Sequence, residues 1–266
     1  MSPAILAILA LVGFGAGFVD AIAGGGGLVT VPALALAGLD PVAVIATNKL
    51  ASAFGSGSAT LAFARAGKID LSVMGLAALG AGLGSIGGAL ALPFVPRQAA
   101  ATALPFILVA VALYFALAPQ IGESDTARKL GPRAFALTIA PLIGFYDGVF
   151  GPGAGSFYTI GFIALAGYGV TRAIANARLA NFASNFGALL VYAFGGHIAL
   201  AAGIAMGAGA FIGSRLGAHA VLGAGVRLVR PLLVVVSCLM AVRLATLPTY
   251  PLHDALMNLI KSLTGG

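Results

Sequence analysis

Residues 20–32 read DAIAGGGGLVTVP, and they interrupt an otherwise apolar chain. Asp20 precedes four consecutive glycines, and Pro32 closes the short β-branched run that follows them. Glycine gives the backbone unusual freedom and lets other groups approach it closely. Irregular backbone at membrane depth is tolerated only where it is buried in protein or lines a cavity. If the surrounding chain lies in lipid, this stretch therefore predicts a discontinuous helix beside an internal site.

Composition indicates that the surrounding chain does lie in lipid. Of 266 residues, 60% are hydrophobic and 8% are charged, with a mean hydropathy of +1.07. Soluble domains carry about 25% charged residues. Apolar runs between helix breakers predict an all-α, multi-pass protein of a bacterial-type inner membrane, with segments at 3–22, 27–39, 41–64, 70–93, 99–118, 133–150, 154–167, 170–194, 198–220 and 226–246. Because a spanning helix needs about 20 residues, 27–39 and 154–167 are too short to cross unaided.

The same composition argues against an enzyme. Cys238 is the single cysteine, and the three histidines His197, His219 and His253 are scattered, so we expect no metal site and no cofactor. The chain has no HExxH motif, no convincing Ser/His or paired-Asp arrangement, no Walker loop and no long soluble region. A nucleic-acid partner is not expected either.

An internal repeat organises the chain. When the sequence is aligned with itself so that residue 15 pairs with residue 144, residues 15–89 align with residues 144–218 without a gap. We call this offset the repeat shift. It matches ALAG at 35–38 with ALAG at 164–167, Gly84-Ser85 with Gly213-Ser214, and residues 24–27 with 153–156. We predict an N-terminal membrane repeat at 1–118, a hydrophilic linker at 119–132, a C-terminal repeat at 133–248 and an amphipathic segment at 249–266.

Basic residues suggest that the second repeat is inverted. With segments crossing in order, one side collects Arg65, Lys68, Arg128, Lys129, Arg133, Arg172, Arg227 and Arg230, and the other keeps Arg97, Arg243 and Lys261. The positive-inside rule places the first group in the cytoplasm. Inversion requires that the paired segments around each glycine loop both cross, or both dip in and return. If each pair fuses into one broken crossing, the repeats are parallel.

Two intramembrane cations mark the candidate substrate site. Lys49 and Arg178 correspond under the repeat shift, and intramembrane charges are costly and generally functional. Each begins a helix face at spacings i, i+3 and i+7, formed by Lys49, Ser52 and Ser56 in one half and by Arg178, Asn181 and Asn185 in the other. The predicted anion site adds further donors and the loop backbone, namely Asn48, Asn176, Gly24, Gly25, Gly26, Gly27, Gly153, Gly155 and Ser156.

Alternatives remain for these residues. Lys49 and Arg178 could instead extend to lipid headgroups. Asp20 and Asp147, which precede the glycine loops, are candidates for coupling to a proton or cation, and structural ion pairing explains them equally well. For the glycines of GAGLGSIGGA at 80–89 and GAGAFIGSRLGA at 207–218, close helix packing is the favoured explanation.

Three motifs carry a family resemblance. VDAIAGGGGLVTVPAL, NKLASAFGSGSATLAF and GFYDGVFGPGAGSFY resemble the TauE/SafE sulfite-exporter family, over nearly the whole chain. The resemblance implies movement of sulfite, sulfoacetate or related organosulfur anions across a bacterial inner membrane, with export favoured. It also implies that both glycine loops matter.

Together these observations predict a secondary transporter that moves a small sulfur-containing anion by alternating access. Inverted repeats with short, glycine-interrupted segments at matching places are typical of such proteins. A passive channel or a permease for another small anion is the alternative. The expected partners are the anion, the bilayer and a coupling proton or cation; a homodimer is compatible with the sequence.

Overall fold

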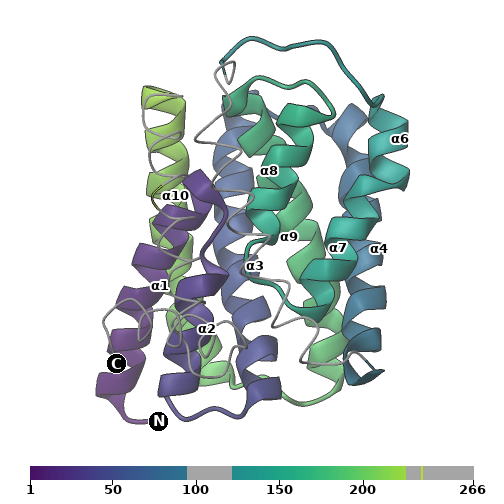
Figure 1. Ribbon diagram of the computed structural model, residues 1–266. Coiled ribbons are helices and arrows are strands. Elements are labelled where there is room, and N and C mark those ends of the chain that lie inside the picture. Colours follow the sequence, from purple (N-terminus) through teal and green to yellow (C-terminus); the bar gives the residue numbers. More distant parts are fainter. Residues whose placement is uncertain (95–121, 226–234, 236–266) are drawn as a thin grey trace, which may run out of the picture.

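The computed structural model describes residues 1–94, 122–225 and 235, and within these ranges the protein is all-helical, as predicted. Figure 1 shows the helices packed side by side in one bundle. They are α1 (Pro3–Ala23), α2 (Gly27–Leu36), α3 (Pro41–Arg65), α4 (Leu71–Ala91) with a 3-10 turn at Leu92–Phe94, α6 (Pro132–Leu137), α7 (Ile139–Val149), α8 (Ala154–Ala164), α9 (Val170–Phe194) and α10 (Leu200–Ala224). The predicted segments at 99–118, 226–246 and 249–266 lie outside the described residues.

Local capping explains where the long helices begin. α1 follows Ser2, whose hydroxyl accepts from the Ile5 amide at 3.4 Å. α3 follows Asp40, whose carboxylate accepts from the Val42 amide at 3.0 Å. Each of these caps is followed by a proline at the first helical position, where the missing N–H costs nothing and the fixed φ suits the helix.

One predicted segment is divided in two. The apolar run 133–150 forms α6 and α7, which meet at Thr138 with φ −121° and ψ −67°. Pro141 lies early in α7, so it cannot donate to the carbonyl of Leu137, and its ring would crowd that carbonyl. The break at Thr138 follows from this proline.

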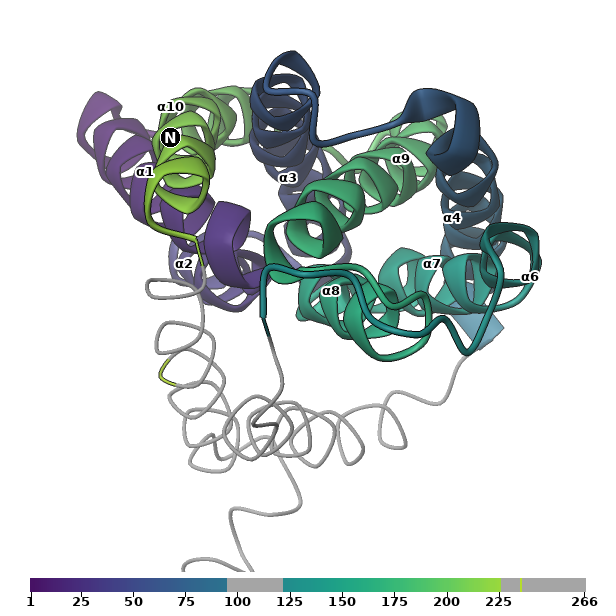
Figure 2. The same ribbon diagram turned by 90° about the horizontal axis from the view of Figure 1, so that it is seen from above.

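Polar helices occupy the middle of the bundle and apolar helices its flanks. α3 packs against α9 at the centre, while α1 packs on α10 and α4 on α7 (Figure 2). Within the described residues, three helices are long and apolar enough to span a membrane: Pro3–Ala23, Leu71–Phe94 and Leu200–Ala224. α3 and α9 are just as long but contain most of the buried polar side chains. Lipid-facing flanks and a polar interior are what a membrane transporter requires.

The helices of the two halves correspond in length and in partners. The repeat shift carries the bounds of α3, 41 and 65, onto the bounds of α9, 170 and 194. α1 packs on α10, and α7, the counterpart of α1, packs on α4, the counterpart of α10. In Figure 1, α3 runs upward and α9 downward, and α1 and α2 form a hairpin that turns inside the bundle. Inverted repeats would produce this arrangement; the repeat itself stays a prediction.

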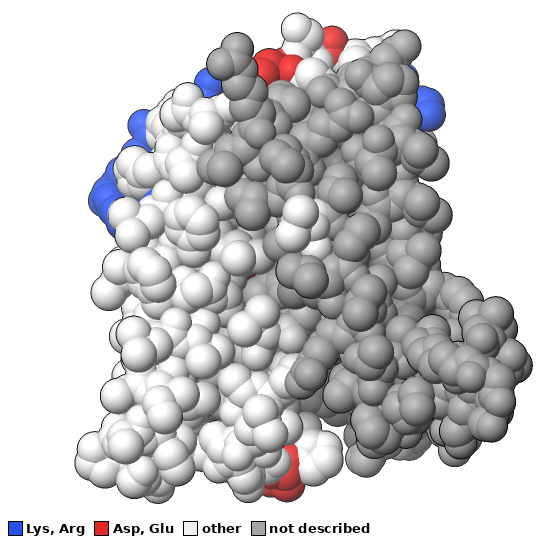
Figure 3. Space-filling view, turned by 60° about the vertical axis from the view of Figure 1, so that its left-hand side comes forward, with Lys and Arg blue, Asp and Glu red and all other residues white. Residues whose placement is uncertain are grey.

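Basic side chains collect at one end of the bundle. The linker crosses this end and is held there, because the amides of Thr126 and Lys129 donate to the carbonyls of Gly167 and Leu165 at 2.7 and 2.9 Å. On the face in Figure 3, the basic atoms of the described residues lie only in the upper half, whereas acidic atoms are visible at both the top and the bottom. This polarity agrees with the charge distribution predicted from the sequence.

Candidate functional site

The two glycine loops meet inside the bundle. α1 ends at Ala23 because Gly24 has φ +82°, a left-handed conformation, and donates its N–H to the Asp20 carbonyl at 2.8 Å. After α7 the chain turns through Gly151, which has φ +87°. Ser156, in the first turn of α8, donates its hydroxyl to the Ala23 carbonyl and so joins the loops. Both breaks in the membrane helices therefore lie at one place.

The glycines at this junction leave room for a guanidinium. A Cβ at Gly24 would overlap the backbone of Gly155 and lie 2.8 Å from Nη2 of Arg178. A Cβ at Gly155 would lie 2.9 Å from both terminal nitrogens of Arg178. The loops thus need glycine here for both conformation and space.

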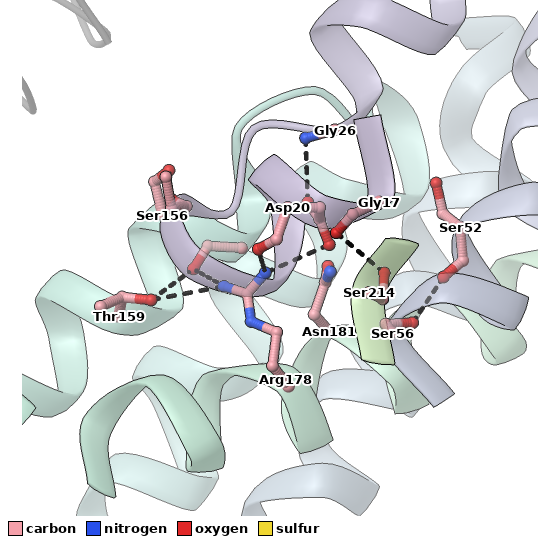
Figure 4. A network of polar contacts seen from close by, with 12 residues as sticks. Gly17, Asp20, Gly26, Ser52, Ser56, Ser156, Thr159, Arg178, Asn181 and Ser214 are labelled. Carbon is pink, nitrogen blue, oxygen red and sulfur yellow. Dashed lines mark hydrogen bonds and ion pairs between the residues drawn. The ribbon is translucent and has the colours of Figure 1, made fainter. Parts of the chain in front are cut away.

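Arg178 is the centre of the first ion pair. Its side chain, from α9, is fully buried, and its Nη1 donates to the Asp20 carbonyl and lies 3.2 Å from Asp20 Oδ2 (Figure 4). Nη2 donates to the Gly155 carbonyl at 2.9 Å and lies 3.4 Å from Thr159 Oγ1. The other carboxylate oxygen, Asp20 Oδ1, accepts from the Gly26 amide at 2.9 Å. We call these contacts the Asp20 node.

Lys49 forms the second ion pair. Its ammonium, from α3, donates to Asp147 Oδ1 at 2.7 Å and also to the Asp147 backbone carbonyl. Ser184 donates its hydroxyl to the second carboxylate oxygen, Oδ2. The Lys49 and Asp147 side chains are 0% and 2% exposed. We call these contacts the Asp147 node.

Each node joins the two halves of the chain. Lys49 in the first half binds an aspartate of the second, and Arg178 in the second half binds an aspartate of the first. A buried charge is tolerated when it is paired and hydrogen-bonded. The alternative that these cations extend to headgroups is wrong for this structure, because both side chains are fully buried inside the bundle.

The ungapped register predicted over 15–89 is wrong in its first part. The repeat shift carries Lys49 onto Arg178, but it carries Asp20 onto Val149 rather than onto Asp147, which makes the matching contacts. Gly24, likewise, corresponds to Gly151 rather than to Gly153, since each is the first left-handed glycine after its helix. The two extra residues of the second half come later: α8 has 11 residues against 10 in α2, and the turn 165–169 is one residue longer than the turn 37–40.

Several predicted donors are occupied within their own half. Ser56 donates to the Ser52 carbonyl at 2.6 Å, and Asn185 donates to the Asn181 carbonyl at 2.8 Å, so both turn back onto their own helix. The amide at Thr30 bonds to its own loop at Gly26, as do its neighbours Leu28 and Val29 to residues 25 and 26. The predicted helix faces therefore present fewer free donors than their spacing suggests.

The remaining predicted residues lie around the two nodes. Asn48 accepts the Thr30 hydroxyl at the start of α2, and Gly27 begins that helix. Gly153, with φ +85°, precedes α8. The Asn176 carbonyl oxygen is buried, and no hydrogen-bond partner is recorded for it.

A small cavity opens beside the Asp20 node. It measures about 20 Å³, room for about one water molecule. Its walls include Asp20, Gly26, Thr30, Ser52, Gly55 and Ser214. The Asp20 side chain retains 17% exposure, against 2% for Asp147. The Asp20 carboxylate therefore borders a water-sized space, whereas the Asp147 carboxylate is enclosed; we call these the open and the sealed node.

The sequence prediction includes the backbone amides near Thr30 and Thr159, but it does not include the side chains of several residues that complete the nodes. Thr30 and Thr159 each donate back one turn, to Gly26 at 3.1 Å and to Gly155 at 2.9 Å. They correspond under the repeat shift, so the repeat itself carried the signal. The repeat does not point to Ser184, because the corresponding residue of the first half is Gly55, which has no side chain.

Comparison with known proteins agrees with the motifs. The family model described as sulfite exporter TauE/SafE matches residues 9–244. The chain belongs to the TauE/SafE family. It is thus a membrane transporter of the TauE/SafE type.

Relatives align over nearly their full lengths. The chain is 47% identical over 249 residues to a probable membrane transporter protein, ORF9, of Sinorhizobium sp, with 94% of this chain and 95% of the relative covered. It is 43% identical over 244 residues to the probable membrane transporter protein YfcA of Escherichia coli K12, covering 92% and 91%. A probable membrane transporter protein of Haemophilus influenzae is 39% identical over 240 residues, covering 90% and 94%. No solved structure matches this TauE/SafE chain significantly.

Proposed function

We propose that this TauE/SafE protein is a secondary transporter of small sulfur-containing oxyanions, such as sulfite, sulfoacetate or isethionate, acting by alternating access. One observation carries the proposal. A fully buried guanidinium, Arg178, lies where both broken helices meet, and its carboxylate partner Asp20 borders a cavity. Guanidinium groups bind planar and tetrahedral oxyanions through paired hydrogen bonds.

The arrangement of the halves supports alternating access. The nodes lie at contacts between helices of different halves, since Lys49 pairs with Asp147 and Arg178 with Asp20. A movement of one half against the other changes both nodes together. Alternating access at a site between two halves is typical of transporters built from repeats.

Orientation and direction form a further part of the proposal. The basic end of the bundle would face the cytoplasm of a bacterial inner membrane under the positive-inside rule. Export is favoured because the family is described as sulfite exporters. Inward transport of the same anion would use the same site, so the proposal about the site does not depend on direction.

Proteoliposomes test the substrate class. Purified protein is reconstituted, and uptake of sulfite, sulfoacetate, isethionate, taurine, sulfate and chloride is measured, with thermal shift in detergent as a second readout. We expect selective uptake of one or more sulfur oxyanions that is lost in Arg178→Ala. Arg172→Ala is the matched control: Arg172 lies on the same helix, but its side chain is 47% exposed and paired with Asp125 at the surface.

Three results would contradict the proposal. Equal movement of every anion, or uptake unchanged by Arg178→Ala, would show that Arg178 does not select the substrate. Downhill flux that never accumulates the anion against its gradient, whatever ion gradient is applied, would favour the passive channel.

A further inference from the structure

We propose that Asp20 takes up a proton when the transported anion binds Arg178, so that anion and proton cross the membrane together. This inference rests on the proposed function and assigns the coupling ion and its carrier. It starts from the difference between the two aspartates, which otherwise make matching contacts with a cation of the opposite half.

The Asp147 carboxylate is fully committed. Oδ1 accepts from Lys49 at 2.7 Å, Oδ2 accepts from Ser184, and the side chain is 2% exposed. With 2% of its side chain exposed, this carboxylate has almost no contact with a source of protons. Asp147 is therefore a poor proton carrier in this conformation.

The Asp20 carboxylate is held more loosely. Its Oδ1 accepts one backbone N–H, from Gly26, and its Oδ2 is 3.2 Å from Arg178 Nη1. The side chain is 17% exposed and borders the cavity. Ser52 and Thr30 line the same cavity. A proton therefore has a route to Asp20 through a polar, water-sized space.

Among the described residues of the helices packed on α1, Arg178 is the charged side chain that pairs with Asp20, whereas Arg172 on α9 pairs with Asp125, and Arg65 on α3 and Arg215 on α10 form no ion pair with it. α9 supplies Arg178, which contacts it, and α3 supplies Lys49, which Asp147 holds. On α10, His219 is exposed and contacts the Arg215 carbonyl at 2.7 Å. On α8, the Tyr158 hydroxyl contacts the Ala140 carbonyl at 3.3 Å, and α2 has no ionisable side chain.

The net charge around Arg178 determines whether a proton must bind together with the anion. The Asp20–Arg178 pair is neutral, and a buried uncompensated charge is strongly unfavourable. An anion that displaced the carboxylate from Arg178 would leave one excess negative charge. If Asp20 binds a proton in the same step, the carboxylate becomes a neutral carboxylic acid, the guanidinium keeps its charge and pairs with the anion, and the site stays neutral. No covalent bond to the anion forms or breaks.

The size of the cavity agrees with displacement rather than simple addition. About 20 Å³ holds one water molecule, which is less than a sulfonate group needs. An anion can reach Arg178 only if the Asp20 side chain and its glycine loop move aside. In the anion-free protein, Asp20 therefore occupies the position of the transported anion.

Isethionate is the probe for this inference, because a sulfonate stays ionised over the whole working pH range. Any proton that moves with it must be carried by the protein. Proteoliposomes containing a trapped pH indicator and a potassium clamp of the membrane potential are given external isethionate. We expect internal acidification of about one proton per anion taken up.

Variants identify the carrier. In Asp20→Asn we expect proton movement to fall to background while exchange of internal for external isethionate continues, because the amide mimics the protonated acid. Asp40→Asn is the matched control, since Asp40 is an exposed helix cap whose loss changes the charge equally, and it keeps proton movement. A measurement without any variant is proton uptake by the wild-type protein in weakly buffered detergent when isethionate is added.

The outcomes separate this inference from the proposed function. Isethionate uptake without proton movement, uptake that requires a sodium gradient, or unchanged proton movement in Asp20→Asn would overturn the inference and leave the proposed function intact. Failure of all the tested anions to move would overturn the proposed function and the inference with it.

Discussion

The Asp20 and Asp147 nodes have the same components but different surroundings. Each joins a cation from one central helix to an aspartate of the opposite half, through both its carboxylate and its backbone carbonyl. At the Asp147 node, Ser184 fills the space beside the carboxylate. At the Asp20 node the counterpart of Ser184 is Gly55, and a cavity lies there instead. The two nodes therefore differ in what lies beside the carboxylate: a hydroxyl that binds it at Asp147, and a cavity at Asp20.

The largest effect is expected from breaking the sealed node. Lys49→Ala leaves Asp147 buried without its cation, which typically costs about 3–5 kcal/mol. We expect loss of monodisperse protein, measured by size-exclusion chromatography and thermal unfolding in detergent. The double variant Lys49→Met, Asp147→Leu removes both charges and should recover most of the stability. If the single variant were fully stable, the Asp147 node would not be structural.

Matched glycines test whether the two halves are equivalent outside the nodes. Gly84 and Gly213 correspond under the repeat shift, and a Cβ on either would collide with a backbone carbonyl, of Pro141 or Phe14. This bears out the close-packing role predicted for their glycine-rich stretches. Alanine at either position should destabilise the protein by about 1–3 kcal/mol, measured by thermal unfolding.

Gly75→Ala is the control for these two substitutions, because a Cβ at Gly75 meets nothing within 4 Å. If alanine at Gly84 and at Gly213 lowers the thermal stability by similar amounts, and alanine at Gly75 does not lower it, the helix packing of the two halves is equivalent. The halves would then differ at the nodes. A loss at only one of the two would mean that the helix pairs themselves differ.

Gly55→Ser should convert the open node towards the sealed one. A Cβ at Gly55 lies 2.9 Å from the Ser214 hydroxyl and 3.3 Å from Ala210 Cβ, so Ser214 must rotate and give up its hydrogen bond to the Gly17 carbonyl, which costs about 1 kcal/mol. We expect stability to change by no more than about 1 kcal/mol while isethionate uptake falls, because the new hydroxyl holds Asp20. Uptake equal to that of the wild type would mean that Gly55 does not keep the site open.

Asp70 provides a baseline for carboxylate titration outside the membrane segments. The Ser72 hydroxyl, at 2.6 Å, and the Ser72 amide lower the pKa of this exposed α4 cap below its ordinary value of 3.8. Its stabilising contribution is therefore present above the unfolded pKa and is lost as pH falls through the lower folded value. Asp70→Asn should slightly reduce the acid-side loss of thermal stability and leave proton movement with isethionate unchanged. Altered proton movement in this variant would weaken the assignment to Asp20.

The sequence by itself determined the helices and their breaks. Apolar runs between glycine and proline residues predicted 170–194, which is α9 without any change, and 41–64, which is α3 but for one residue. These features are local, because a membrane span needs a continuous apolar run and a helix break needs glycine or proline nearby. Lys49 and Arg178 were also selected from local sequence, because a basic residue inside an apolar run is costly in a membrane and is generally functional.

Only the tertiary structure decided what each cation binds. Lys49 and Asp147 are 98 residues apart, and Arg178 and Asp20 are 158 apart, so no periodicity connects them. The side chains of Ser56 and Asn185 could face a site or their own helix, and that choice depends on packing around them. Gly55 lines the cavity beside Asp20, whereas Ser184, its counterpart under the repeat shift, binds Asp147. The sequence does not show this difference, because it does not place either residue beside an aspartate. Space and charge pairing are properties of the assembled bundle, and they distinguish the node that borders a cavity from its enclosed counterpart.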